Sequence, residues 1–169
     1  MYKKASLISL TGIYKKYTIK IGFKTQGDKV QECIYYIKGY HNTKRNKGIG
    51  AEHIKLYLKK GTRGEITLDE LLNIGDSIRK YLKIFKEPFV ESNNAKIYEW
   101  QDENGVRFRS VTDKVKGEGH SNTPLSSFEE AIITFYSDRN FKQRMQFKNP
   151  KVEAYYKEDS KHNHIKRQK

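Results

Sequence analysis

The side chains of this sequence best placed for chemistry are one imidazole, two guanidinium groups and two hydroxyls: His53, Arg107, Arg109, Thr134 and Tyr136. An imidazole exchanges protons near neutral pH, and guanidinium groups bind phosphate oxygens through paired hydrogen bonds. Hydroxyl groups can orient a phosphate that is being cleaved. Together these residue types are the ones that cleavage of a phosphodiester without a metal requires.

The helices and strands that would position these groups can be predicted from the spacing of apolar and polar residues. Residues 47–58 (KGIGAEHIKLYL) place two glycines before a short apolar helix, so His53 would lie on its first turn. Because side chains alternate between the faces of a strand, a strand over residues 105–112 has both arginines on one face. A strand over residues 131–137 likewise has its Thr and Tyr on one face. If the apolar faces pack on helices, the four side chains emerge together on the open side of a sheet.

The remaining pattern predicts strands before and between helices. Residues 17–23 and 29–40 are rich in strand-forming residues and would pair as an N-terminal hairpin. A helix is predicted over residues 51–59. Residues 96–101 and 105–112 flank Asp102-Glu103-Asn104, and the pair Asn104-Gly105 is typical of a tight β-hairpin.

A second helix begins at Thr67, which forms a capping box with Glu70. Its predicted apolar stripe is made of Leu68, Leu71, Leu72, Ile78 and Leu82. Strands, then helices, then strands predict an α+β fold, with helices packed on a small twisted antiparallel sheet.

The composition favours an anionic partner. The chain has 169 residues, 34 Lys and Arg, 20 Asp and Glu, and a formal net charge of +14. Residues 139–169 carry ten Lys or Arg against three Asp or Glu, so half of the net charge lies in the last fifth of the chain. Such an excess, interleaved with 12 tyrosines and 8 phenylalanines, is typical of proteins that bind nucleic acid. An anionic membrane, an acidic protein, or charge that serves solubility alone would also account for it.

Other classes of site have little support. The single cysteine, Cys33, allows no intramolecular disulfide and no thiolate metal cluster, so we expect neither a metal nor a cofactor. The glycine stretch fits neither a Walker A motif nor a dinucleotide-binding motif. No segment is long and apolar enough to span a bilayer, so a cytoplasmic protein with no membrane partner is expected. A toxin domain cut from a larger secreted protein would look the same.

Four segments resemble a known family: KGIGAEHI, ITLDELLNIGDSIR, IYEWQDENGVRFRSV and AIITFYSDRN. They are similar to the barnase/colicin-type endoribonucleases of phages and bacterial polymorphic toxins, a group with the barnase–EndoU–colicin–RelE-like (BECR) fold. The likeness covers about residues 46–141. It implies a nuclease domain there, an N-terminal extension over residues 1–45 and a basic tail over residues 142–169.

The resemblance implies that His53 is the catalytic histidine and that the arginines and hydroxyls named above complete the site. Relatives often carry a second polar residue shortly after EHI, where this chain has Tyr57 and Leu58. The general acid therefore stays open. His120 in a polar loop is one candidate, although a surface role is favoured for it, as it is for His41. The neighbouring cations that would bind RNA are Lys44, Arg45, Lys47, Arg139, Lys142 and Arg144.

The leading hypothesis is a metal-independent endoribonuclease toxin. It would cleave RNA, with tRNA as one candidate substrate, through the 2′-hydroxyl to give a 2′,3′-cyclic phosphate. An acidic immunity protein or antitoxin would be its protein partner. Two alternatives remain open: a nucleic-acid-binding module without catalysis, and a phage interaction protein whose basic tail docks on an acidic partner.

Overall fold

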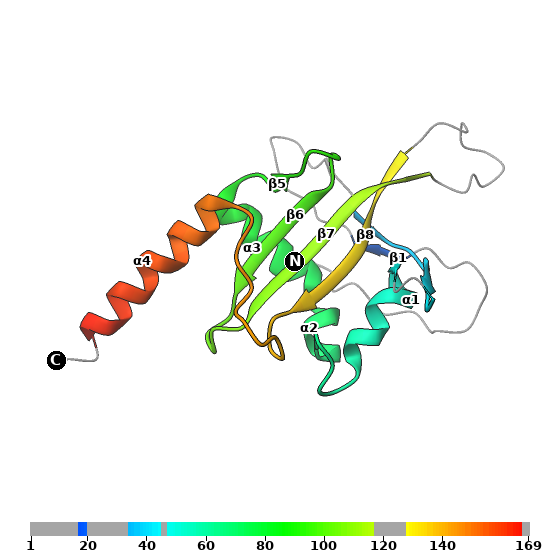
Figure 1. The fold of residues 1–169 in the computed structure, drawn as a ribbon. Coiled ribbons are helices and arrows are strands. Elements are labelled where there is room, and N and C mark those ends of the chain that lie inside the picture. Colours follow the sequence, from blue (N-terminus) through cyan, green and yellow to red (C-terminus); the bar gives the residue numbers. More distant parts are fainter. Residues whose placement is uncertain (1–16, 20–33, 45–46, 117–127, 167–169) are drawn as a thin grey trace, which may run out of the picture.

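The structure, a computed structural model, describes residues 17–19, 34–44, 47–116 and 128–166. These residues form an α+β fold with helices behind a six-stranded sheet (Figure 1). In spatial order the sheet consists of β1 (Tyr17–Ile19), β2 (Ile34–Tyr36), β8 (Phe128–Ser137), β7 (Arg107–Lys116), β6 (Lys96–Gln101) and β5 (Phe89–Val90).

A small second sheet and the helices complete the described fold. The second sheet pairs β3 (Tyr40–Asn42) with β4 (Lys47–Ile49). The helical elements are α1 (Ala51–Ile54), the 3-10 helix η1 (Lys55–Leu58), α2 (Leu68–Leu72), α3 (Ile74–Phe85) and α4 (Pro150–Lys166).

The central hairpin follows the prediction. β6 and β7 are antiparallel neighbours joined at Asn104-Gly105, and Gly105 has a φ of 81°. The Asp102 carboxylate closes the turn, because it accepts backbone N–H groups of Asn104 and Val106 at 3.0 and 2.8 Å. β8 then pairs antiparallel with β7, so the predicted neighbourhood of these two strands is confirmed.

The N-terminal strands belong to the main sheet. β1 and β2 pair antiparallel, as predicted, with Tyr17 opposite Tyr36. β2 also pairs with β8, and this pair is parallel, with Ile34 opposite Glu130. The predicted antiparallel pairing holds for the other described pairs of this sheet, and this one parallel pair makes the sheet mixed. About ninety residues separate β2 from β8, and a crossover of that length allows a parallel neighbour, which a tight hairpin cannot.

The predicted helices are shorter than the sequence pattern suggested. The segment expected as one helix over residues 51–59 is α1 followed by the 3-10 turn η1. The capping box of Thr67 and Glu70 is confirmed, but α2 ends at Asn73, which has a φ of −96° and a ψ of 8°. Because this break changes the phase of the stripe, Leu68 and Leu72 are 60% and 49% exposed.

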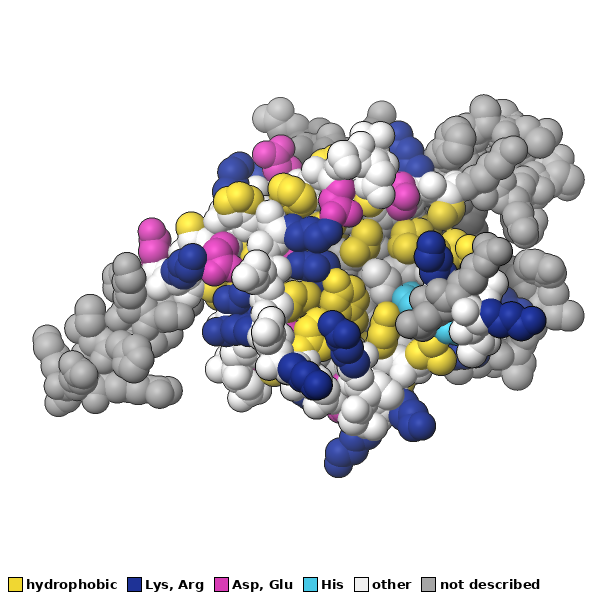
Figure 2. All heavy atoms as spheres, in the orientation of Figure 1, with side chains coloured by type: hydrophobic (Ala, Val, Ile, Leu, Met, Phe, Trp, Pro, Cys, Tyr) yellow, Lys and Arg dark blue, Asp and Glu magenta, His cyan; other side chains and the backbone are white. Residues whose placement is uncertain are grey.

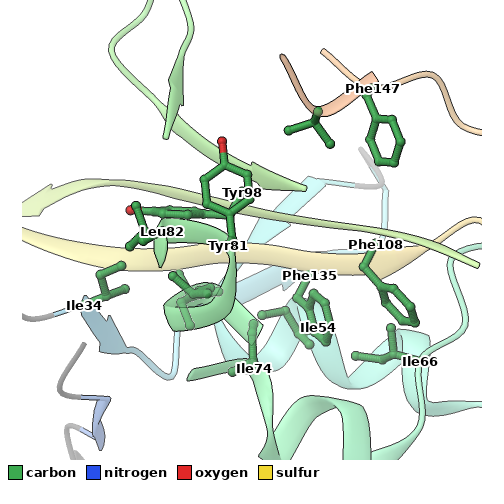
Figure 3. Close-up of a cluster of buried hydrophobic side chains, with 13 residues drawn as sticks. Ile34, Ile54, Ile66, Ile74, Tyr81, Leu82, Tyr98, Phe108, Phe135 and Phe147 are labelled. Atoms are coloured by element: carbon green, nitrogen blue, oxygen red, sulfur yellow. The ribbon is translucent and has the colours of Figure 1, made fainter. Parts of the chain in front are cut away.

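The hydrophobic core lies between the sheet and its helices. Phe108 and Phe135, from β7 and β8, pack close to Ile54, Ile66 and Ile74 (Figure 3). All five side chains are at most 2% exposed. Burial of an aliphatic or aromatic side chain of this kind contributes about 1.5–3 kcal/mol. The core therefore fixes α1, and with it His53, against the sheet.

The C-terminal segment covers the opposite face of the sheet. Residues 138–149, which we call the strap, run across the front of the molecule between β8 and α4 (Figure 1). The Asp138 carboxylate anchors the strap by accepting backbone N–H groups of Arg107 and Met145 at 2.8 and 3.0 Å. Phe147 and Val152 are buried in the core cluster. Packing therefore continues beyond residue 141, the last residue of the region of family resemblance.

Candidate functional site

Two histidines from different elements meet at the edge of the sheet. His41 of β3 and His53 of α1 have their Nδ1 atoms 3.2 Å apart, within hydrogen-bond distance. Their rings are nearly parallel, at 11°, with centroids 5.4 Å apart. The described histidine side chains are visible at the surface of the face drawn in Figure 2. One histidine must donate and the other accept, so the protonation states of the two rings are coupled.

The local backbone builds this pair. His41 lies opposite Gly48 in the β3–β4 hairpin. A Cβ at position 48 would lie 2.4 Å from the Tyr40 carbonyl oxygen and 3.0 Å from His41 Nδ1, so only glycine fits there. Gly50 has a φ of 71° and donates its N–H to the Ile133 carbonyl of β8 at 2.8 Å. These glycines therefore set the direction in which α1 leaves the hairpin.

Tyr57 completes a row of three side chains. Its hydroxyl lies 3.1 Å from His53 Nε2, and its ring meets the imidazole edge-on. His53 and Tyr57 are four residues apart, which is the spacing of neighbours on one helical face. Both ring nitrogens of His53 are therefore engaged, one by His41 and the other by Tyr57.

The surroundings shift the pKa values of His53 and Tyr57 in opposite directions. Partial burial, and then the neighbouring His41, lower the pKa of His53 below 6.5. His53 is therefore predominantly neutral at pH 7, as a general base must be. Burial raises the pKa of Tyr57 above 10, Thr134 lowers it to a smaller extent, and Tyr136 raises it. Tyr57 therefore keeps its proton at neutral pH and can donate it.

A glycine packs against Tyr57 where its ring approaches β8. Its ring lies 6.1 Å from that of Tyr136, centroid to centroid. Gly64, with a φ of 91°, packs beneath both rings: a Cβ there would lie 2.9 Å from Tyr57 Cδ1 and 3.4 Å from Tyr136 Cβ. The Gly64 carbonyl accepts the N–H of Ser137 at 3.3 Å. The loop before α2 is thereby held against the end of β8.

Arg109 links this row to a buried carboxylate. Arg109 lies opposite Tyr136 in the sheet and donates to its hydroxyl at 3.1 Å. On its other side it donates through Nε to Glu99 at 2.7 Å, and Nη2 bonds the Gln146 carbonyl at 2.7 Å. Burial by itself lowers the pKa of Arg109, but Tyr136 and Glu99 outweigh it and raise the value. Arg109 is therefore a fixed cation beside the Tyr136 hydroxyl.

Thr134 lies on the same face as Tyr136, as predicted from strand alternation. It pairs with Val111, and its hydroxyl faces Tyr57 closely enough to affect the Tyr57 pKa. Thr134 Oγ1 is nevertheless buried and makes no hydrogen bond of normal geometry with any described residue. Thr134 therefore influences the site through its proximity to Tyr57, whose pKa it lowers.

Arg107 is directed away from the histidines. It is only 9% exposed, donates to the Met145 carbonyl at 2.6 Å and stacks 4.1 Å above the Phe147 ring. It also forms an ion pair with Glu153 of α4 at 3.4 Å. Arg107 therefore holds the strap and α4 on the sheet. The two arginines do share a face, and both donate to carbonyls of the strap, whereas Arg109 also donates to the Tyr136 hydroxyl.

The six cations that are predicted to bind RNA differ in whether they are exposed or already paired with other groups. Lys44 and Lys47 are exposed on the β3–β4 hairpin beside the histidines, and Lys142 is exposed on the strap. Arg139 is paired with Glu70 at 2.5 Å, and Arg144 donates to Gln101 at 2.7 Å. Arg45 and the loop histidine His120 lie outside the described residues.

Sequence reasoning missed three residues of this site. The sequence pattern favours a surface role for His41, but the β3–β4 hairpin brings this residue onto His53. Tyr57 was detectable from its spacing of four residues after His53. Glu99 carried no signal, because its partners come from β7 and from backbone N–H groups of the strap almost fifty residues away.

Within the described residues, no group of three or more His, Cys, Asp or Glu side chains is arranged to hold a metal ion. Among the helices of the described part of the chain, none is long and apolar enough to cross a membrane.

Comparison of the chain with protein-family models, with curated proteins and with solved structures finds no match.

Proposed function

We propose that this protein is a metal-independent endoribonuclease that cleaves RNA through the 2′-hydroxyl. The observation that carries the proposal is the row His41–His53–Tyr57, with ring nitrogen and hydroxyl contacts of 3.2 and 3.1 Å, beside Tyr136 and Arg109. A neutral imidazole, a protonated phenol and a fixed cation stand together on a basic molecule. The proposed site resembles that of the barnase/colicin-type nucleases in residue type, and the α+β fold is compatible with theirs.

His53 serves as the general base in this proposal. When Tyr57 donates to Nε2, the His53 proton lies on Nδ1 and is donated to His41. The Nε2 lone pair then accepts the proton of the RNA 2′-hydroxyl as the substrate takes the place of the tyrosine. The oxygen attacks phosphorus and the bond to the 5′-oxygen breaks, which leaves a 2′,3′-cyclic phosphate and a 5′-hydroxyl.

Tyr57 and Tyr136 supply protons and hydrogen bonds to the phosphate. Tyr57 stands beside His53 with its proton retained, so we assign it the protonation of the leaving 5′-oxygen. The Tyr136 hydroxyl accepts a hydrogen bond from Arg109, which leaves its own proton free to bind a phosphate oxygen. Positioned donors of this kind contribute roughly 3–4 kcal/mol each to lowering the barrier.

The first test is cleavage of total RNA in EDTA by the wild type, His53→Ala and Tyr155→Ala. Tyr155 lies exposed on α4, outside the site, and its variant serves as the control. The proposal expects discrete fragments with cyclic phosphate ends from the wild type and from the control only. Intact RNA after incubation with folded wild-type protein would refute it.

A second test separates the two proton-transfer roles. Tyr57→Phe should slow the cleavage of RNA by about 100-fold or more, since general acid catalysis contributes a factor of that order. A nucleoside 3′-(4-nitrophenyl phosphate) has a leaving group that needs no proton, so the same variant should cleave it almost normally. His53→Ala should be slow on both substrates. Equal losses for Tyr57→Phe on both substrates would remove it from the acid role.

A second candidate function is RNA binding without catalysis. Specific contacts favour it: both ring nitrogens of His53 have partners, and Arg109 is already bonded to Glu99, Tyr136 and Gln146. This candidate expects RNA to be bound with a strong salt dependence and left intact. It also expects His53→Ala to bind as tightly as the wild type.

Localisation and partners follow from the first proposal. As a toxin the enzyme would act on RNA in the cytosol, and a producing cell would need protection from it. An acidic immunity protein or antitoxin that covers the histidines and the cations of the β3–β4 hairpin would provide that protection by charge complementarity.

A further inference from the structure

An aromatic ring and a cation lie next to Tyr136 of the candidate site. Phe141 of the strap stacks on Tyr136, with centroids 6.3 Å apart and planes at 17°. The guanidinium carbon of Arg63 lies 4.9 Å from the centroid of the Phe141 ring. Arg63 is exposed, and Phe141 is partly exposed. The proposed catalytic groups are therefore adjoined by a stacked ring with a cation over it.

The segments that carry these two side chains are tied together. Asn140, next to Phe141, donates to the Thr62 carbonyl at 3.1 Å and to the Glu65 carboxylate at 2.7 Å. Arg139 donates to the Glu65 carbonyl at 3.3 Å. The ring is thus held in place before any ligand arrives, which lowers the conformational cost of binding.

The charge around the ring favours an anionic chain. Exposed cations lie close in sequence to the two residues of this pair: Lys59 and Lys60 precede Arg63, and Lys142 follows Phe141. Two carboxylates of the same segments already have partners: Glu65 accepts from the Gly61 N–H and from Asn140, and Glu70 pairs with Arg139. A flat, partly exposed ring among cations is the arrangement by which proteins bind bases of single-stranded nucleic acid.

We infer that Phe141 and Arg63 form a stacking subsite for one nucleobase of single-stranded RNA, next to the phosphate bound at Tyr136. This inference rests on the proposed function, because it takes Tyr136 as the phosphate-binding group. Every base has a π-face, so the subsite selects an unpaired base over a paired one and discriminates weakly among the four bases. The enzyme would therefore prefer loops and single strands to duplex RNA.

The test uses a 2′-O-methyl oligoribonucleotide, which cannot be cleaved through its 2′-oxygen, with 2-aminopurine placed at successive positions. Stacking quenches the fluorescence of this base. We expect saturable quenching at one position with the wild type, and its loss with Phe141→Ala. Affinity should fall roughly 5- to 150-fold, the range of one base–aromatic stack. Phe141→Trp should restore it, and Arg63→Gln should weaken it less than Phe141→Ala does.

Tyr155→Ala is the matched control, since it removes an exposed ring from α4 and leaves the site intact. Equal quenching with the wild type and Phe141→Ala would overturn the inference, as would the absence of quenching at every position. Parallel cleavage of the unmodified RNA in EDTA distinguishes the two proposals. Cleavage without position-specific quenching removes the stacking subsite alone. Quenching that depends on Phe141, without cleavage, removes the ribonuclease proposal and retains the subsite.

Discussion

The buried ion pair of Glu99 and Arg109 gives the sharpest prediction about stability. Glu99 is 0% exposed, and the side chain of Arg109 is 11% exposed. The carboxylate accepts from Arg109 and also from the backbone N–H groups of Lys148 and Asn149, at 2.8 and 3.1 Å. A single side chain therefore holds the guanidinium of the site and the end of the strap.

Glu99→Gln keeps the shape of the side chain and removes its charge. The guanidinium then loses its counter-ion, and the new amide turns two donor hydrogens toward groups that are themselves donors. Loss of one partner of a buried ion pair costs about 3–5 kcal/mol. For a chain of this size, 1 kcal/mol corresponds to roughly 2–4 °C in Tm, so we expect a decrease of about 6–20 °C.

The assay is urea unfolding followed by circular dichroism, with the free energy of unfolding extrapolated to water. Glu87→Gln is the control, because the Glu87 side chain is 76% exposed and pairs with Lys151 on the surface. An exposed pair contributes about 0–1 kcal/mol, so this variant should unfold almost as the wild type does.

A double-mutant cycle tests the reasoning itself. Glu99→Gln combined with Arg109→Gln should cost less than the two single changes together, with a coupling of at least about 1 kcal/mol. A Glu99→Gln variant within 1 kcal/mol of the wild type, or a coupling near zero, would show that the pair does not hold the site together. The strap would then be positioned by its other contacts, among them those of Arg107 and Asp138.

Three further predictions concern the elements around the site. Gly64→Ala should destabilise the protein by more than Gly61→Ala in urea unfolding. Both positions have a positive φ, but a Cβ at position 64 would lie 2.9 Å from the Tyr57 ring, whereas a Cβ at position 61 meets no atom within 4 Å. Equal losses would show that backbone strain alone decides. Thr67→Ala should cost about 1 kcal/mol in the same assay by removing the capping box of α2, and an unchanged midpoint would contradict that role. In an NMR titration His53 should titrate below 6.5, and His41→Ala should raise its pKa; a value that stays the same or falls would refute the coupling of the two rings.

The His53 shift also sets the sign of two pH effects. A base must be neutral, so cleavage should decline as the pH falls through the lowered pKa of His53. The same shift means that the folded protein binds this proton less readily than the unfolded chain. Above 6.5 the residue therefore leaves stability unchanged, and its contribution becomes destabilising as the pH falls from 6.5 through the folded-state value.

Sequence alone determined the local parts of this protein. The Asn104-Gly105 hairpin, the capping box at Thr67 and the alternation that puts Arg109 and Tyr136 on the faces they occupy all depend on neighbours within a few residues. Such features need only backbone preferences and strand periodicity, so a single sequence reveals them. The α+β class follows from the order of these elements.

Tertiary structure decided which of the candidate groups meet. Arg107 and Arg109 are equivalent by alternation and both donate to the strap, yet Arg107 packs over Phe147 and Arg109 donates to Tyr136. His41 joins His53 only because a hairpin with glycine at position 48 folds one ring onto the other. These contacts connect residues from 12 to about 50 positions apart, and their geometry is set by packing of the whole sheet, which no local pattern encodes.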